Sequence, residues 1–355
     1  MYYPTETRIT PLTTIRRERL LPSRGQVLVR PGEVVGPNDV VARCPLPGQV
    51  LVVDVARALG VRRERVARFL RKNAGDPVQA DELLAAPRGV WGRFRRGCRA
   101  PVDGRIVAIR NGLVLMEAAA TTLELTAHTR GQVTNVMPNL GVVISTVGAL
   151  IQGVWGTGGE AEGVLKVLVD NPQKPLRAKA IDVSCHGTLV VGGRILDKQT
   201  LEQAVEAKVR GIIVGSVNAD LLPVLRAMPF PILITEGFGA LPMSTPAFSL
   251  LQANLGREAM ISAGTQTRWD VRRPEVIIPL RSEELPPEKP GPLALEIGMW
   301  VRVIRGPHLG AVGSVTDLPA RPQAVESGCR LPVAEVELEK AGKVLVPLAN
   351  LELIR

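Results

Sequence analysis

The chain has 355 residues and a formal net charge of +10 at pH 7, and 45% of its residues are hydrophobic although only 3% are aromatic. A chain of this length is too long for one ordinary core, so we expect several domains with cores of Val, Leu, Ile and Ala. The excess of Lys and Arg lies in the first half of the chain and is greatest between residues 57 and 99. This concentration favours a polyanionic partner or an acidic protein surface, although an Arg-rich solvated face would have the same composition.

Cysteine spacing and hydropathy argue against several classes of protein. Cys44, Cys98, Cys185 and Cys329 lie far apart and form no CxxC pair, so neither a zinc site nor a disulfide framework is predicted. No N-terminal stretch combines a basic start with an apolar run, and no stretch reaches the length of a membrane helix. We therefore expect a cytoplasmic protein with no membrane partner, no metal and no cofactor.

Residues 1–24 are polar and irregular and predict an N-terminal arm, and residues 25–177 predict a β-rich domain. In that domain an extended segment, a turn and a second extended segment run through Val27-Leu-Val-Arg-Pro-Gly-Glu-Val-Val-Gly-Pro-Asn-Asp-Val-Val-Ala42. The same phrase recurs at Gly75-Asp-Pro-Val-Gln-Ala-Asp-Glu-Leu-Leu-Ala85, and Cys98-Arg-Ala-Pro-Val-Asp-Gly-Arg-Ile-Val-Ala-Ile109 follows it. β-Branched residues between Gly, Pro and Asp are typical of short strands joined by turns.

These phrases resemble the barrel-sandwich hybrid of the biotinyl/lipoyl-like superfamily, whose members repeat "GD-x-V-x-x-G-x-x-(I/L)-A" and "A/S-P-x-x-G-x-(I/V)". The resemblance covers residues 25–125. The modifiable lysine of the carrier proteins, which lies between small or Met neighbours, is missing here, so covalent biotin or lipoyl attachment is not expected. The resemblance implies a scaffold, and this scaffold occurs in enzymes, transporters and transcription machinery alike.

A basic insertion at residues 53–73 separates the two phrases. It places Ala56, Gly60 and Val66 where a helix-turn-helix has its packing, turn and second-helix residues, and a second helix there would reach a major groove. The alternative is a short helical hairpin that decorates a β barrel. Trp91-Gly-Arg-Phe-Arg-Arg96 adds aromatic residues that could stack on bases or cover a barrel end. The candidate nucleic-acid contacts are Arg62, Arg63, Arg65, Arg68, Arg71, Lys72, Arg93, Arg95 and Arg96.

Residues 178–273 have the pattern of an alternating α/β unit. Predicted strands and helices follow one another in the order strand 180–184, strand 187–191, helix 198–208, strand 211–215, helix 218–228, strand 231–235, helix 245–253 and strand 258–262. This alternation predicts a small parallel sheet with right-handed crossovers, and by topology it resembles the swivelling α/β domains that bridge or gate multidomain proteins. Ligands of such sheets bind beyond the carboxyl ends of the strands, so the possible ligand site comprises Ser184, His186, Ser216, Thr235 and Glu236.

Prolines mark residues 274–292 as a stiff linker that begins with a strand at 275–278, and residues 293–355 predict a C-terminal domain. The run Ile297-Gly-Met-Trp-Val-Arg-Val-Ile-Arg-Gly-Pro-His-Leu-Gly-Ala-Val-Gly-Ser-Val315 resembles a KOW motif, which occurs in transcription elongation factors and ribosomal proteins. The resemblance implies an SH3-like barrel that residues 334–338 and 343–347 complete. It also implies exposed contacts to RNA or protein at Arg302, Arg305, Gly306, His308, Gly310 and Lys343.

We therefore expect a multidomain, β-rich fold with one α/β unit: a barrel-sandwich hybrid, a small parallel α/β domain and a C-terminal SH3-like KOW barrel. The C-terminal domain has equal numbers of acidic and basic residues, so we assign any binding of a polyanion to residues 57–99. The first functional hypothesis is a non-catalytic adaptor of the transcription or translation machinery, with RNA polymerase or the ribosome as possible partners. The alternatives are a self-assembling homo-oligomeric structural protein, and a ligand sensor or enzyme with its site at the strand ends of the α/β domain.

Overall fold

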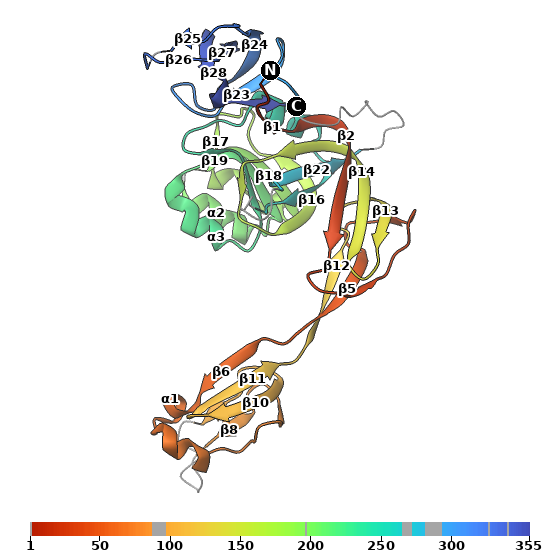
Figure 1. The fold of residues 1–355 in the computed structure, drawn as a ribbon, viewed down its shortest axis with the longest axis vertical. Coiled ribbons are helices and arrows are strands. Elements are labelled where there is room, and N and C mark those ends of the chain that lie inside the picture. Colours follow the sequence, from red (N-terminus) through yellow and green to blue (C-terminus); the bar gives the residue numbers. More distant parts are fainter. Residues whose placement is uncertain are drawn as a thin grey trace.

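The computed structural model describes residues 2–86, 97–195, 197–264, 272–280, 293–325, 327–338 and 341–355. The fold is β-rich and multidomain, as the sequence predicts, and the molecule is elongated (Figure 1). Four parts follow one another along the long axis: a C-terminal sheet, a central sheet, a middle module and a tip module. The middle module comprises residues 26–46 and 121–144 and shares strands with the central sheet, and the tip module comprises the described residues between 50 and 118. Within the described ranges, no helix is both long and apolar enough to cross a bilayer.

The central sheet contains 12 strands within the described part of the chain. Its members, in spatial order, are β15 (Trp155–Gly156), β20 (Ile232–Phe238), β19 (Gly211–Val217), β18 (Thr188–Ile195), β16 (Glu160–Val167), β21 (Glu258–Ser262), β22 (Glu275–Pro279), β14 (Gly141–Gln152), β13 (Gly131–Met137) and β4 (Val34–Val35), with β17 (Pro175–Leu176) paired to β18 and β2 (Ile9–Leu20) paired to β14. The predicted boundaries at 177/178 and 273/274 both cut this sheet. They were placed by local composition, whereas strand pairing joins segments that are distant in sequence.

The α/β unit forms the parallel part of this sheet. Strands β18, β19 and β20 run parallel to one another, as predicted, and β16, from the expected β-rich domain, runs parallel to β18. Strand β21, expected in the parallel sheet, is instead antiparallel to β16 and β22. Helices α2 (Lys198–Glu206) and α3 (Leu222–Arg226) cover one face of the sheet through Leu201 and Leu225, and η5 (Ala219–Leu221) precedes α3. Helix α4 (Thr245–Ala253) packs Phe248 and Leu251 against the other face.

The first strand expected in this unit, at residues 180–184, is absent. The chain forms two 3₁₀ turns there, η3 (Ala178–Ala180) and η4 (Val183–Cys185). The Asp182 carboxylate accepts a hydrogen bond from the Ser184 N–H at 3.0 Å. This local hydrogen bond uses a backbone N–H that a strand would donate to its neighbour, so the turn competes with strand formation here.

The middle and tip modules are two copies of one structure. Both recurring phrases form the same turn, with left-handed glycines at Gly32 (φ +86°) and Gly75 (φ +97°). In the first copy the Arg30 N–H donates to the Glu33 carboxylate at 2.9 Å, and in the second the Asn73 N–H donates to the Asp76 carboxylate at 2.7 Å. In both modules, a glycine with positive φ and a following carboxylate that accepts a backbone N–H form the same turn.

Strand pairing repeats with the same register. Gly131 of β13 lies opposite Val35 of β4, and Gly104 of β10 (Gly104–Arg110) lies opposite Val78 of β7 (Pro77–Val78). The pairing of β3 (Gln26–Val27) with β5 (Val40–Leu46) recurs as the bridge between Leu70 and Ala85. The predicted repeat is thus a structural duplication, and each copy has a core of its own.

The tip module is inserted into the middle module through two strands. The chain leaves along β5 and β6 (Val50–Asp54) and returns along β11 (Leu113–Ala118) and β12 (Thr121–Thr126), with β5 paired to β12 and β6 paired to β11. Strands β8 (Leu83–Ala85) and β9 (Cys98–Arg99) form a separate pair in the tip module. A Cβ at Gly48 would overlap the carbonyl oxygen of Ala118, so the two strands cross in close contact where the insertion begins. The tip module lies at the far end of the molecule from the C-terminal sheet (Figure 1).

The C-terminal sheet has the order β1 (Thr5–Thr7), β29 (Leu351–Ile354), β23 (Trp300–Val303), β24 (Val312–Asp317), β27 (Val333–Leu338) and β28 (Gly342–Pro347), and a small hairpin of β25 (Gln323–Ala324) and β26 (Arg330–Leu331) lies beside it. η6 (Leu348–Asn350) precedes β29. The strands expected at 334–338 and 343–347 are present, and the barrel types expected here and in residues 25–125 stay predictions.

The described residues of the expected N-terminal arm, 2–24, are not irregular but form strands of two sheets. Strand β1 pairs in parallel with β29, and β2 pairs with β14 along most of its length. The described part of the N-terminal segment therefore contributes strands to both the C-terminal and the central sheet, and it ties the two sheets together.

Candidate functional site

A basic helical hairpin forms one end of the tip module. Helix α1 (Val55–Leu59) begins where the Asp54 carboxylate accepts the Arg57 N–H at 2.9 Å, and it ends at Gly60, whose φ is +66°. Ala56 and Val66 are buried in the core of the tip module. The three residues that suggested a helix-turn-helix therefore do form a turn and its packing contacts.

The second element is not the α-helix that a helix-turn-helix requires. Residues Arg63–Arg68 form a 3₁₀ helix, η1, of 6 residues. The alternative interpretation from the sequence, a short helical hairpin on a β-rich module, describes the structure better. The reason is that Val66 faces the core while the chain must return within a few residues to pair Leu70 with Ala85.

The 3₁₀ geometry aligns arginines. Such a helix has about 3 residues per turn and rises about 2.0 Å per residue, so residues three apart lie along one edge about 6 Å from each other. Arg65 and Arg68 of η1 have this spacing, Arg62 lies three residues before Arg65 as the N-cap residue with an extended backbone, and all three are exposed. We call these three residues the arginine row.

The basic residues around this row differ in their partners. Lys72 pairs with Glu82 at 2.6 Å, and this contact lowers the pKa of the Glu82 carboxyl below its ordinary value. Arg63 lies 4.0 Å from Asp54. Within the described residues, no ion pair is formed by the arginine row or by the exposed Arg71. Arg93, Arg95 and Arg96 lie outside the described residues.

The structure separates the candidate ligand residues of the α/β unit into two groups. Ser216, Thr235 and Glu236 lie near the carboxyl ends of β19 and β20, as expected. Ser184 and His186 lie before β18, at the opposite edge of the sheet, because the expected strand at 180–184 is absent. Ser184 bonds to Asp182 and to Lys166, and His186 is exposed.

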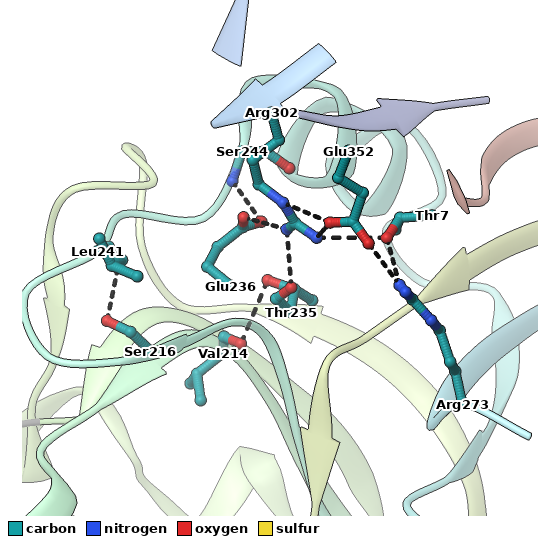
Figure 2. A network of polar contacts seen from close by, with 10 residues as sticks. All are labelled: Thr7, Val214, Ser216, Thr235, Glu236, Leu241, Ser244, Arg273, Arg302 and Glu352. Carbon is teal, nitrogen blue, oxygen red and sulfur yellow. Dashed lines mark hydrogen bonds and ion pairs between the residues drawn. The ribbon is translucent and has the colours of Figure 1, made fainter. Parts of the chain in front are cut away.

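At the carboxyl ends of these strands lies a buried cation from the C-terminal sheet. Arg302, expected as an exposed contact for RNA or protein, is only 3% exposed, and its guanidinium pairs with Glu236 and Glu352 (Figure 2). It also donates to the Thr235 carbonyl at 3.0 Å. The KOW resemblance therefore misassigned Arg302, which binds the central sheet instead of a partner.

Neighbouring groups extend this network, which we call the arginine clamp (Arg302, Glu236, Glu352, Arg273 and Thr7). Arg273 donates to Glu352 at 2.8 Å and also to the Thr7 hydroxyl, while the Glu236 carboxylate accepts the Ser244 N–H at 3.0 Å. Burial alone would raise the pKa of the Glu352 carboxyl, but the Arg302 guanidinium holds it below its ordinary value. The carboxylates of Glu236 and Glu352 raise the pKa of Arg302, although the burial of its guanidinium alone would lower it. Glu352 and Arg302 therefore both carry their charges at neutral pH.

The other residues implied by the KOW resemblance lie nearer the surface. Arg305 and Lys343 are exposed, and Lys343 pairs with Glu335 at 3.1 Å. Gly306 and Gly310 adopt left-handed φ values in the loop, and His308 is half-buried. Arg305 and His308 line a groove of about 530 Å³ beside β28, together with Leu345, Pro347, Val325 and neighbouring residues.

Sequence reasoning missed three members of the arginine clamp, namely Thr7, Arg273 and Glu352. One signal was present at Glu352, a charged residue between two leucines of a short apolar strand, Leu351-Glu-Leu-Ile354. Across the described residues, no group of His, Cys, Asp and Glu is arranged to hold a metal ion.

No protein-family model matches this chain, and no curated protein matches its sequence.

Proposed function

We propose that this protein is a non-catalytic adaptor that binds nucleic acid through its tip module. The observation that carries the proposal is the arginine row, three exposed arginines spaced three residues apart that have no carboxylate partner within the described residues. Phosphate neutralisation by Lys and Arg supplies most of the affinity for a nucleic-acid backbone. Arginines at this spacing suit successive phosphates of one strand, because Arg binds phosphate through paired N–H donors.

The shape of the molecule supports an adaptor. The row lies on a module that two strands hold away from the central sheet (Figure 1). A module in this position can contact a nucleic acid while the central and C-terminal sheets remain free to contact another partner. Attachment to the transcription or translation machinery through Arg305, His308 and Lys343 is the part of the proposal that rests on the KOW resemblance.

The test measures binding of labelled duplex DNA and of structured RNA across about 50 to 300 mM salt. Wild type is compared with Arg62, Arg65 and Arg68 all changed to Ala. A control with equal charge removes three exposed arginines in or directly beside the α/β unit, Arg177, Arg210 and Arg226.

We expect salt-dependent binding whose log–log slope becomes shallower by about 0.9 for each duplex phosphate that the row variant no longer neutralises. The control should retain the wild-type slope, because its arginines lie on another part of the molecule. Absence of binding at the lowest salt, or an equal decrease of affinity in the two variants, would contradict the proposal.

A further inference from the structure

The C-terminal sheet ends at β28, whose outer edge pairs with no strand within the described residues. The register of β27 and β28 decides which backbone groups lie on that edge. The Leu348 N–H donates to the Pro332 carbonyl at 3.1 Å, and the pairing then continues along both strands without a shift. Hydrogen-bonded pairs alternate along an antiparallel ladder, so every second residue of β28, counted back from Leu348, bonds to β27. Lys343 and Leu345 lie between those residues and direct their N–H and C=O groups to the open edge.

A groove of about 530 Å³ runs along this edge. Both the inward-facing Val344 and Val346 and the outward-facing Leu345 and Pro347 line it, so the groove follows the backbone edge of β28 and not one face of the sheet. The other lining residues come mostly from the loop after β23 and from the turn of the β25–β26 hairpin: Arg305, Pro307, His308, Ala324, Val325 and Ser327. A chain in this groove would contact the backbone and the side chains of β28 together.

The charge of the groove restricts what can bind there. Among the described residues that line it, Arg305 is the one permanent charge, and no Asp or Glu is present. Arg305 is exposed and forms no ion pair with a described residue. Most of the other lining side chains are apolar, and Leu345 is 45% exposed. This composition suits a ligand with a carboxylate and apolar side chains, whereas a nucleic-acid strand requires several cations.

Unpaired edge strands accept extended peptides as additional strands, in which backbone hydrogen bonds give affinity and alternate side chains give specificity. We propose that β28 binds an extended acidic peptide segment of a partner protein in this way. The peptide backbone bonds to Lys343 and Leu345, a peptide carboxylate pairs with Arg305, and apolar side chains of the peptide pack against Leu345 and Val325. This inference rests on the attachment surface of the proposed function and gives the chemistry of its partner.

The first test selects binders from a phage-displayed library of random linear peptides on the full chain. We expect enriched sequences in which an Asp or a Glu lies among alternating apolar residues. Selected peptides that lack an acidic residue, or the absence of any enrichment, would overturn the proposal. Fluorescence polarisation of a labelled selected peptide then measures its affinity for wild type and for variants.

Arg305→Met removes the cation of the groove and should weaken peptide binding about 2- to 5-fold, as expected for a partly exposed ion pair. Arg321→Met is the matched control, because Arg321 is an exposed arginine of the same domain that does not line the groove. This control should bind the peptide as wild type does. Equal affinities of the two variants for the peptide would contradict the pairing with Arg305.

N-Methylation of single residues in the peptide tests strand addition without any change to the protein. Only one edge of an added strand faces β28, so methylation should weaken binding at every second residue, by about 3- to 10-fold for each lost hydrogen bond. Methylation of the residues between them should leave the affinity unchanged. An affinity that falls equally at all positions, or at none, would show that the peptide does not bind as a strand.

Failure of this inference is distinguishable from failure of the nucleic-acid proposal. The variant of the arginine row should bind the peptide as wild type does, and Arg305→Met should bind duplex DNA and structured RNA as wild type does. An RNA that competes with the peptide, and that binds Arg305→Met more weakly than wild type, would make the groove a nucleic-acid site and overturn the assignment to a peptide.

Discussion

The guanidinium of Arg302 in the C-terminal sheet is paired with the carboxylate of Glu236 at the end of β20, and both side chains are almost completely buried. A second carboxylate, Glu352, also pairs with Arg302, and Arg273 balances its charge. The two parts of the chain therefore do not meet through a solvated linker. They are joined by buried charges that depend on one another, so a change to any one of these charges should affect the stability of the whole junction.

Removing the cation of the arginine clamp should be costly. Arg302→Met leaves the carboxylates of Glu236 and Glu352 buried without their main partner, and loss of one member of a buried ion pair typically costs about 3–5 kcal/mol. Urea unfolding measures this loss. Arg305→Met is the matched control, because Arg305 is exposed in the loop that follows β23, and it should change the free energy of unfolding by no more than about 0.5 kcal/mol. Equal stability of the two variants would show that the clamp contributes nothing.

Acid should weaken the clamp through Glu352. Its pKa in the folded protein lies below the ordinary value of 4.5, so the unfolded chain takes up the proton first as the pH falls. The stability that Glu352 contributes is therefore fully present above pH 4.5 and is lost as the pH falls through the folded-state pKa.

Unfolding free energies at neutral pH and below pH 4.5 test this sign. Glu352→Gln should be less stable than wild type at neutral pH, and the difference between the two proteins should shrink as the pH falls below 4.5. A difference that stays constant, or grows, with acidity would refute the assignment.

The prediction of this fold from the sequence succeeded where the signal was local. The recurring phrase of Gly, an acidic residue and alternating Val or Leu determines its own turn and strand, so both modules could be anticipated from residues 27–42 and 75–85. The helices of the α/β unit were also recognisable, because their apolar spacing is a local property. Arg65 and Arg68 were correctly identified as exposed, although the 3₁₀ geometry that aligns them was not foreseen.

The arginine clamp could not be found in the same way. Arg302 is 66 residues from Glu236 and 50 from Glu352 along the sequence, and nothing near it distinguishes a surface arginine of a KOW-like loop from a buried one. The pairing of β1 with β29 joins the two ends of the chain and has no local signal either. Such contacts depend on how sheets pack, which the residue pattern of each strand leaves open.

The duplication predicts equivalent roles for two glycines. A Cβ at Gly131 would collide with the Ser145 carbonyl in the middle module, and a Cβ at Gly104 would collide with the Glu117 carbonyl in the tip module. Each Gly→Ala change should therefore destabilise its own module by about 1–3 kcal/mol through overpacking. Hydrogen exchange measured by mass spectrometry should show faster exchange in residues 98–118 for Gly104→Ala and in residues 131–145 for Gly131→Ala. Gly264→Ala is the control, since no atom lies within 4 Å of its added Cβ.

The tip module should be separable from the rest of the protein. Leu46 and Thr121 lie opposite each other in the pair formed by β5 and β12, so an Asn-Gly turn in place of residues 47–120 would close a hairpin with no change in register. The tip module has its own core, which includes Val55, Leu84, Ile106 and Met116, and the middle module retains a different one. Because the two cores share no residue, the shortened protein should unfold cooperatively with a thermal midpoint close to that of wild type.

This deletion also separates folding from binding. The shortened protein should lose salt-dependent affinity for nucleic acid, because it lacks the arginine row. Isolated residues 49–118 should retain the nucleic-acid affinity that the shortened protein lacks. If the shortened protein still bound nucleic acid with the wild-type salt slope, the nucleic-acid-binding site would lie outside the tip module. Arg305, His308 and Lys343 would then be the next residues to change. If it failed to fold, the middle module would depend on the tip module, and the two cores would form one cooperative unit despite their separation in space.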